Sequence, residues 1–445
     1  MDGAEQGKEQ RLMMKRMMRV ALVSTLMAAP VGLVSTAAQA QQNATYDLLT
    51  VLGDAIAKIR SSYVEPVDEE KLIEAAVNGM LQSLDPHSAF LPPERVKQMQ
   101  VSIRGEFGGL GIEVTMENGY VKVVTPIDDT PAARAGVQPN DLVPHIAGTS
   151  VQGLTLTEAV KEMRGAVGTD IVLTVNRVGV PDAFDITITR AVIKVQSVRA
   201  RAEGNVAYVR ITSFTEQTES GLRKSMKKLK EEIGEDIAGV ILDLRNNPGG
   251  LLDQAIAVSD AFLDRGEIVS TRARDVSAIE RYNAKPGDLA AGLPVIVLIN
   301  GGSASASEIV AGALQDHKRA ILMGTTSFGK GSVQSIMQLG GGNQLKLTTA
   351  RYYTPSGNSI QATGIIPDQQ ISAWALSDDA EADVPQIGSE ADLDGALVNE
   401  NGDERETTDI AAVEQPPADW PEDEDYQLPR AVELLTSAME TQQAF

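Results

Sequence analysis

The chain has 445 residues and a formal net charge of −22, with 42% hydrophobic and 22% charged residues. This composition is typical of a soluble globular protein of two or three domains, and the acidic balance gives no reason to expect nucleic-acid binding. The absence of cysteine excludes thiol nucleophiles and thiolate metal sites, and the only histidines are His87, His145 and His317.

The first forty residues have the pattern of a secretory signal peptide. Three basic side chains precede an apolar run from Val20 to Ala38, which ends in an A-x-A site before Gln41. An uncleaved membrane anchor is the alternative, although Pro30 and Gly32 make the run poor for a span. We therefore expect a signal peptide over 1–40 and a periplasmic protein. Membrane association stays open as the alternative.

Residues 41–100 form the expected N-terminal helical region. Apolar residues recur at helical spacing from Leu48 to Leu81, with a turn at Glu65-Pro66, so two helices are predicted. Their apolar surface either faces a second copy of the chain, giving a homo-oligomer, or packs on the body; both readings stay open.

A module of about ninety residues, 101–190, follows. Its predicted strands are 111–116, 120–125, 142–146, 171–175 and 184–189, with helices at 131–135 and 155–164. GGLGIEV from Gly108 with DDTPAARAGVQPNDLV from Asp128 resembles a PDZ domain. In such a domain a glycine-bent loop leads into an edge strand and holds a peptide C-terminus. The expected peptide-binding residues are Gly109, Leu110, Gly111 and Ile112.

The sequence departs from the PDZ pattern at two sites. Asn140 stands where glycine is usual, and Pro144-His145 interrupts a strand that is usually regular. The resemblance still implies the fold.

Residues 191–376 alternate strands and helices, which predicts an α/β domain with its loops gathered at strand ends. The predicted strands are 206–211, 239–244, 295–299, 320–323 and 344–354, and the predicted helices are 219–233 and 252–263, with a further helix after Ile299.

The last part of the chain is strongly acidic. Residues 377–427 hold eighteen Asp or Glu against one basic residue, Arg405, and lack periodicity, so this segment is expected to be disordered. Residues 428–445 are expected to form a terminal helix.

Two short motifs carry the chemistry. GGSASASEIVAGALQD places Ser303, Ser305 and Ser307 at the mouth of a helix, where unpaired N–H groups stabilise an oxyanion. TSFGKGSVQ holds Lys330 between two glycines. No histidine is placed to take a proton from these serines, so the pattern indicates a Ser-Lys hydrolase. From the residues alone any of the three serines can attack, and Ser303 can instead be an N-cap.

With DLRNNPGG and RYYTPSGNSIQATGI, these motifs resemble the carboxy-terminal processing peptidases, the tail-specific Ser-Lys serine proteases. The resemblance covers residues 46 to about 376 and implies an α/β core resembling the ClpP/crotonase-like fold. It implies that Ser305 is the nucleophile, that Lys330 is the general base, and that Gln334 orients the lysine amine.

The resemblance also implies supporting residues. The oxyanion hole would use the backbone N–H of Ala306 and one from Gly249 or Gly250, with Gly250 favoured. Glu308 and Asp316 match supporting positions, although a structural role on the helix face is at least as good an explanation.

Mechanistically, Lys330 must be neutral to accept a proton, so its pKa must lie well below the ordinary value of about 10.4, and burial supplies such a shift. The expected enzyme is an ATP-independent endopeptidase that needs no metal or cofactor. The PDZ domain would capture protein substrates by their C-termini, with an adaptor protein as an open alternative for delivering them.

Two other functions compete with this interpretation. Gly324 to Lys330 fits the P-loop pattern G-x-x-x-x-G-K, but Gly331 stands where magnesium ligation requires Ser or Thr. A non-enzymatic PDZ scaffold is the second alternative, and it predicts decay at Ser305 or Lys330, which is not seen.

Overall fold

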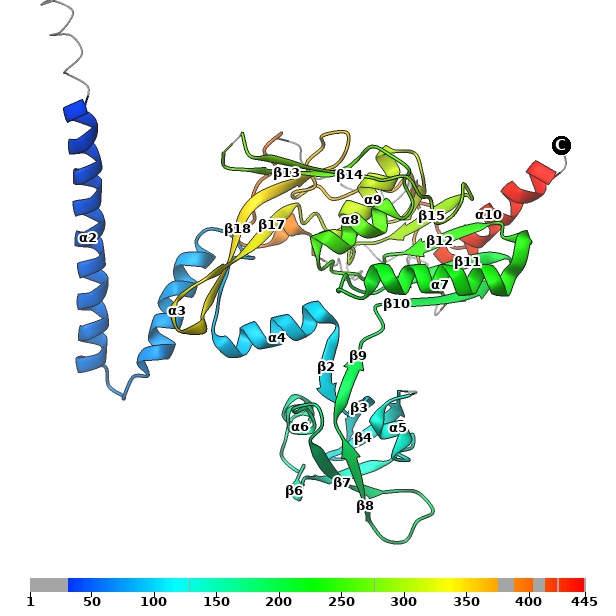
Figure 1. The fold of residues 1–445 in the computed structure, drawn as a ribbon, viewed down its shortest axis with the longest axis horizontal. Helices are drawn as coiled ribbons and strands as arrows, with labels where there is room; N and C mark the ends of the chain where they lie inside the picture. Colours follow the sequence, from blue (N-terminus) through cyan, green and yellow to red (C-terminus); the bar gives the residue numbers. More distant parts are fainter. Residues whose placement is uncertain are drawn as a thin grey trace, which may run out of the picture. The chain divides into compact units, whose positions relative to one another are not determined.

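The computed structural model describes residues 31–127, 129–275, 277–374, 388–402, 413–421 and 424–443. Its contacts divide the chain into two compact units, Met1–Val77 and Asn78–Phe445, whose elements are labelled in Figure 1. Residues 1–30 of the predicted signal peptide lie outside the described residues. Within the described part of the chain, no helix has the length and apolar character needed to cross a bilayer.

The first unit contains α2 (Val31–Ser62) and the start of α3 (Glu69–Gln82). The turn between the two helices includes the expected break at Glu65-Pro66, and Asp68 Oδ1 accepts a hydrogen bond from Glu70 N (3.0 Å) where α3 begins. Two helices therefore form as predicted. Several large apolar side chains of α2 are exposed: Tyr46, Leu48, Leu49, Val51, Leu52 and Ile59.

The module at 101–190 is an antiparallel sheet with two short helices. Its elements are β2 (Glu106–Gly109), β3 (Ile112–Glu117), β4 (Tyr120–Pro126), α5 (Pro131–Arg134), β5 (Leu142–Ile146), β6 (Thr149–Ser150), α6 (Leu156–Met163), β7 (Asp170–Asn176), β8 (Phe184–Thr189) and β9 (Ala191–Lys194). The strand order is β3-β4-β5-β7-β8, so β3 lies at an edge, and β2 pairs with β9 where the chain enters and leaves. Every element predicted in this module is present.

The two departures from the PDZ pattern have local solutions. Asn140 adopts a left-handed conformation (φ 69°), which asparagine tolerates better than most residues other than glycine. Pro144 and His145 stay within β5, and the pairing of β5 with β7 shifts register between Leu142 and His145.

The larger α/β domain is built on two sheets. Its elements are β1 (Ala89–Leu91), α4 (Pro93–Arg104), β10 (Val198–Glu203), β11 (Val206–Ile211), α7 (Thr218–Ile233), η1 (Gly234–Asp236), β12 (Gly239–Asp243), α8 (Leu252–Asp260), β13 (Glu267–Ala273), β14 (Ile279–Asn283), β15 (Val295–Ile299), α9 (Ala306–Asp316), β16 (Ile321–Gly324), β17 (Ser332–Gln338), η2 (Gly340–Gly342), β18 (Gln344–Tyr353), β19 (Gln369–Gln370), η3 (Glu390–Asp392) and α10 (Gln427–Gln443).

The central sheet has the order β10-β11-β12-β15-β16-β19, and β11 to β19 are parallel. β12 and β15 are buried along their whole length, as expected for parallel strands covered on both faces. One face packs with α7, α8 and α9, and the other is covered by α10 through Ala431 and Leu435 (Figure 1). The terminal helix therefore forms close to its predicted position.

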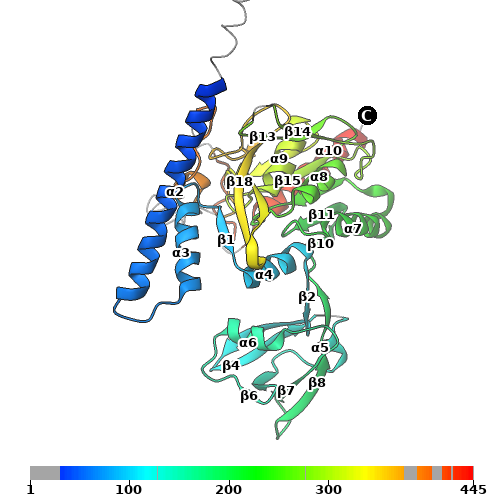
Figure 2. The same ribbon diagram turned by 60° about the vertical axis from the view of Figure 1, so that its left-hand side comes forward.

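A second sheet joins segments that are far apart in the sequence. Its order is β1-β18-β13-β14, with β17 also paired to β18. β1 pairs with the start of β18, with Ala89 opposite Lys346, and Figure 2 shows cyan β1 beside yellow β18. Residues from Asn78 onward therefore belong to the second unit rather than to the predicted N-terminal helical region.

Within the acidic segment expected to be disordered, residues 388–402 instead fold against the α/β domain. Ser389, Glu390 and Asn399 are buried there, and η3 forms at 390–392. The composition did not reveal this because a few buried, hydrogen-bonded polar residues sit among many exposed acidic ones. Residues 375–387 and 403–412 of this part of the chain lie outside the described residues.

Candidate active site

Three loops leave the central sheet at the carboxyl ends of neighbouring parallel strands. They follow β12 (244–251), β15 (300–305) and β16 (325–331). Because these ends meet at one edge of the sheet, the DLRNNPGG, SASAS and GKG motifs lie together there.

The structure separates the roles of the three serines. Ser303 and Ser307 are fully buried. The Ser303 hydroxyl donates to Leu244 O (2.9 Å), and the Ser307 hydroxyl donates to Asn247 O (2.9 Å). Both bonds connect the N-terminal end of α9 to the loop after β12. Ser305 is the partly exposed serine of the three. This geometry leaves Ser305 as the hydroxyl available to a substrate.

The backbone at Ser305 is strained. Ser305 immediately precedes α9 and has φ 55° and ψ −110°, a conformation that non-glycine residues rarely adopt. Gly249 lies against it, since a Cβ at Gly249 would be 2.7 Å from Ala304 O and 3.0 Å from Ser305 Cβ. Strain held in place by close packing at a helix mouth is typical of an exposed nucleophile.

Glu308 connects the serine to the lysine. Its carboxylate is fully buried, and one oxygen, Oε2, accepts from the backbone N–H of Ser305 (2.6 Å) and from that of Lys330 (2.9 Å). The other oxygen accepts from Gly329 N (2.6 Å) and from the Ser327 hydroxyl (2.6 Å). A single carboxylate therefore holds the backbones of Ser305 and Lys330 side by side.

Two opposing effects act on Glu308. Burial raises the pKa of its carboxyl to about 7, while the four donors favour the ionised form. A proton on Glu308 would displace at least one of these donors, so the arrangement seen here is that of the carboxylate.

The loop that carries Lys330 (325–331), here called the lysine loop, packs closely against the turn at 359–365. Gly329 O accepts from Ala362 N (2.8 Å), and Gly331 N donates to Gln361 Oε1 (3.1 Å). A Cβ at Gly331 would lie only 2.3 Å from Gln361 N, so glycine is required there for steric reasons. The flanking glycines therefore permit close packing around Lys330, as the sequence indicated.

Lys330 itself is half-buried. Burial lowers the pKa of its amine below 10.5, and the positive charge of Lys346 lowers it further. Three carboxylates, those of Glu390, Glu308 and Asp85, act in the opposite direction. The net effect lowers the pKa of the Lys330 amine, which is the direction that a general base requires.

Gln334 does not orient the lysine amine in this structure. Its Nε2 donates to Ser332 Oγ (3.0 Å) and lies 3.3 Å from Thr348 Oγ1, and none of the described residues is hydrogen-bonded to the Lys330 amine. The register of β17 explains the difference, because Gln334 pairs with Thr348 of β18 after a shift between Val333 and Gln334.

The expected oxyanion donors are distinguished by their partners. Gly249 N–H is already used, since it donates to Asn247 Oδ1 (2.9 Å). Among the described residues, none accepts a hydrogen bond from Gly250 N–H or Ala306 N–H. Asp316, by contrast, lies at the far end of α9, where its carboxylate accepts from Ser356 N (2.8 Å), so it serves a structural contact.

The backbone amides of the lysine loop bear on the P-loop alternative. In a P-loop these N–H groups cradle phosphates. Here Gly329 and Lys330 donate to Glu308 and Gly331 donates to Gln361, so these N–H groups are already used within the protein. Within the described residues, no group of three or more His, Asp or Glu side chains is arranged to hold a metal.

Sequence reasoning missed several residues of this site. Asn247 joins the loops: its carbonyl accepts from Ala304 N (3.0 Å), and its Nδ2 donates to Ile211 O (2.9 Å). Ser327 and Gln361 support the lysine loop, and His87 with Glu390 approaches it from segments remote in sequence. For Ser327 and Gln361 the only available signal was their position inside TSFGKG and SIQATG, and for Asn247 its position inside DLRNNPGG.

The loop of the smaller module that was expected to bind a peptide forms a glycine-bent turn before the edge strand β3. Leu110 is buried, Gly111 has φ 80°, and Ile112 begins the edge strand β3. A Cβ at Gly111 would lie 2.2 Å from the Thr130 side chain, so this turn requires glycine.

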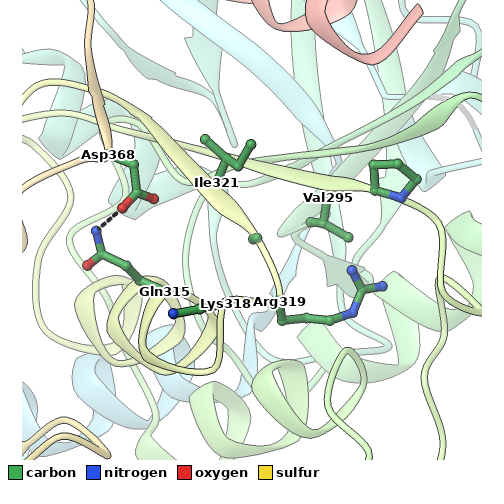
Figure 3. A pocket seen from close by; sticks show the side chains of 8 residues that line it. Val295, Gln315, Lys318, Arg319, Ile321 and Asp368 are labelled. Carbon is green, nitrogen blue, oxygen red and sulfur yellow. Dashed lines mark hydrogen bonds between the residues drawn. The ribbon is translucent and has the colours of Figure 1, made fainter. Parts of the chain in front are cut away.

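A separate pocket lies at the opposite, amino-terminal ends of β15 and β16 (Figure 3). Its lining includes Val295, Arg319 and Ile321. Gln315 Nε2 donates a hydrogen bond to Asp368 there (2.9 Å). It contains none of the predicted site residues.

Comparison with known proteins follows the same division of the chain. The model described as peptidase family S41 matches residues 205–371, the PDZ domain model matches 108–188, and the model described as the activating protease CtpB N-terminal domain matches 17–94.

Whole-chain relatives extend these matches. The carboxy-terminal-processing protease of Bartonella bacilliformis is 52% identical over 396 residues, which is 89% of each chain. The carboxy-terminal processing protease CtpA of Bacillus subtilis is 37% identical over 71% of this chain and 67% of that protein. Among solved structures, the photosystem II D1 C-terminal processing protease is 30% identical over 73% of this chain and 88% of that chain, with a TM-score of 0.43.

Proposed function

This chain belongs to the carboxy-terminal processing proteases of peptidase family S41, and we propose that it cleaves peptide bonds with a Ser305–Lys330 dyad. The observation that carries the dyad is the Glu308 carboxylate, one oxygen of which accepts from the N–H groups of both residues. Ser305 is the nucleophile and Lys330 the general base.

The reaction runs in two halves. Neutral Lys330 takes the hydroxyl proton as Ser305 Oγ attacks the scissile carbonyl, and the resulting ammonium gives that proton to the leaving amine as the peptide bond breaks. Water then attacks the acyl-serine, Lys330 again accepts a proton, and the serine regains it as the new carboxyl terminus leaves. No ATP enters either half, which supports an ATP-independent enzyme.

The developing oxyanion is stabilised by the N–H groups of Ala306 and Gly250. Ala306 N–H lies at the N-terminus of α9, where the helix dipole adds to its effect. Gly250 is preferred over Gly249 because Gly249 N–H is bound to Asn247. Loss of one such donor costs about 10²- to 10³-fold in kcat in serine proteases.

Substrates are proteins bound by their C-termini at the PDZ domain. The free edge of β3 next to the Gly109–Ile112 turn supports this role, because a peptide can add to it as a further strand. A peptide with small or apolar terminal residues is the substrate class that fits.

The dyad is tested by cleavage of an unstructured peptide with an apolar C-terminus. Ser305→Ala and Lys330→Ala are expected to reduce kcat to background. Ser303→Ala and Ser307→Ala remove buried hydrogen bonds and are expected to lower stability more than kcat. Cleavage by the Ser305→Ala protein, with Ser303→Ala or Ser307→Ala inactive, would reject the assignment.

Two further properties complete the proposal. Export by the signal peptide would place the enzyme in the periplasm, and fractionation of cells with an antibody to the chain checks this. The exposed apolar side chains of α2 would pair with a second copy of the chain, forming a homo-oligomer. Light scattering of the wild type and Leu49→Lys is expected to show an oligomer that the substitution weakens.

A further inference from the structure

Residues 389–400, here called the strap, run across the lysine side of the active site although they lie beyond the segment matched to peptidase family S41. Backbone and side-chain contacts fix the strap at both ends. Glu390 holds its start and Asn399 Nδ2 donates to Gln361 O (3.0 Å) near its end, where Glu400 also pairs with Arg351 and Tyr353. The orange segment beside β17 in Figure 1 includes this strap.

The Glu390 side chain is fully buried and has specific partners. Its two carboxylate oxygens lie 2.9 and 2.8 Å from His87 Nε2, which comes from the loop before β1. One of these oxygens also accepts from Gln361 Nε2 (3.0 Å). Burying a carboxylate is costly unless such partners compensate for its lost hydration, so this position is built for a charge.

Glu390 reaches the lysine loop on both sides of Lys330. On one side its backbone N–H donates to Phe328 O (3.0 Å), two residues before the lysine. On the other side the connection passes through Gln361. Its Nε2 donates to Glu390, and its Oε1 accepts from Gly331 N (3.1 Å), one residue after the lysine. Gln361 Nε2 also donates to Leu397 O (3.0 Å), a second strap residue.

The strap also contributes charge to the site. The charged groups that act on the Lys330 amine are Lys346 of β18, Glu308 of α9, Asp85 of the loop before β1, and Glu390 of the strap. The negative charge of Glu390 favours the protonated amine and so raises the pKa of Lys330, against the effect of burial.

We propose that Glu390 of the strap is a positioning residue for catalysis, which holds the Lys330 loop through Phe328 and Gln361. The proposal rests on the proposed role of Lys330 as general base. It assigns a function in catalysis to the acidic C-terminal segment, which the family domain does not include.

The test compares full-length variants by kcat, KM and the pH profile of kcat/KM on the same peptide. Glu390→Gln keeps the shape of the side chain but places an amide N–H₂ against His87 or Gln361, so kcat is expected to fall about 10- to 100-fold with little change in KM. Loss of the negative charge is also expected to move the acid limb of the profile to lower pH. A purely structural role would not produce that shift.

Two further variants separate position from charge. Asn399→Ala removes one hydrogen bond from the strap, that to Gln361 O, without changing any charge, so kcat is expected to fall with the pH profile unmoved. Asp394→Asn removes a charge from an exposed position on the same strap and is expected to match the wild type in both readouts.

The outcomes distinguish this inference from the proposed function. If the wild type cleaves, Ser305→Ala and Lys330→Ala do not, and Glu390→Gln and Asn399→Ala match the wild type, the strap proposal is overturned and the dyad stands. If Lys330→Ala keeps wild-type activity, the dyad itself fails. Circular dichroism melts identify a variant that has not folded, and Asn399→Ala then decides the question in place of Glu390→Gln.

Discussion

Glu308 shows how much one buried side chain determines in this site. Its carboxylate accepts four hydrogen bonds, one from the serine backbone and three from the lysine loop. The sequence could not distinguish a supporting role from a structural one at this position. In the structure the two roles coincide, because the contacts that order the backbone also hold Ser305 and Lys330 together.

Replacement of Glu308 by Gln should disable the enzyme. A glutamine offers one acceptor oxygen and turns an N–H₂ group towards N–H donors, so at least one buried donor loses its partner. We expect kcat to fall about 100-fold and the free energy of unfolding to fall by about 1–3 kcal/mol. Asp316→Asn, at the other end of the same helix, is the control and should leave kcat unchanged; a similar loss in both variants would contradict this account.

Lys346 should affect the pH dependence of catalysis. Its positive charge disfavours protonation of Lys330, so Lys346→Met should raise the pKa of the Lys330 amine. Because the proposed general base must be neutral to accept a proton, the acid limb of kcat/KM should move to higher pH. The measurement is a pH profile of both proteins, and a shift to lower pH would show that another group controls the limb.

At the scale of elements, the regular helices and strands were predictable because their apolar residues repeat with the right period. β5, β8, β11 and β15 occur at their predicted residues. β13, β14 and β17 were missed. β14 and β17 are largely exposed or half-exposed and give weak alternation, and all three strands belong to a sheet that the remote pairing of β13 with β18 joins. The pairing of β17 with β18 explains why Gln334 contacts Thr348 and not the lysine.

The candidate site was predictable in part for the same reason. The motifs located the serines and the lysine, and family spacing pointed to Ser305, which the burial of Ser303 and Ser307 supports. His87 and Glu390 could not have been paired from the sequence, because 303 residues separate them and neither belongs to a recognisable motif with the other.

The lysine loop provides a steric prediction at this scale. In Gly331→Ala the new Cβ would lie 2.3 Å from Gln361 N, so the loop must move and Lys330 with it. We expect kcat to fall about 100-fold while KM changes little. Gly340→Ala, in the turn between β17 and β18, adds a Cβ with nothing within 4 Å and should leave kcat unchanged. Equal activity of the two variants would contradict the tight fit.

For the whole molecule, several segments outside residues 205–371 complete the fold of the peptidase domain. The loop carrying His87 precedes it, and the strap and α10 follow it. Arg245 of the DLRNNPGG motif donates to Asp425 (2.8 Å) and Gln427 (2.9 Å), so the start of α10 is attached directly to the loop that carries Gly250. The C-terminal region is therefore part of the structural support of the site.

Truncation of one side chain in α10 should test this support. Leu435 is almost fully buried against the central sheet, so Leu435→Ala should lower the free energy of unfolding by about 2–5 kcal/mol. Glu433→Ala removes an exposed side chain of the same helix and should change it by less than about 1 kcal/mol. Urea denaturation compares them, and equal stabilities would show that α10 is not part of the cooperative unit.

The last prediction concerns substrate capture by the molecule as a whole. If the PDZ turn holds a C-terminal carboxylate, amidation of a peptide substrate removes a charged hydrogen-bond acceptor while leaving the scissile bond untouched. Charge-assisted hydrogen bonds contribute about 1.5–3 kcal/mol, so kcat/KM should fall about 10- to 100-fold. The loss should appear in KM, because a contact remote from the reacting atoms is the same in ground and transition states. A loss in kcat instead would mean that docking at the PDZ domain also organises the Ser305–Lys330 dyad, and equal rates for both peptides would exclude carboxylate capture.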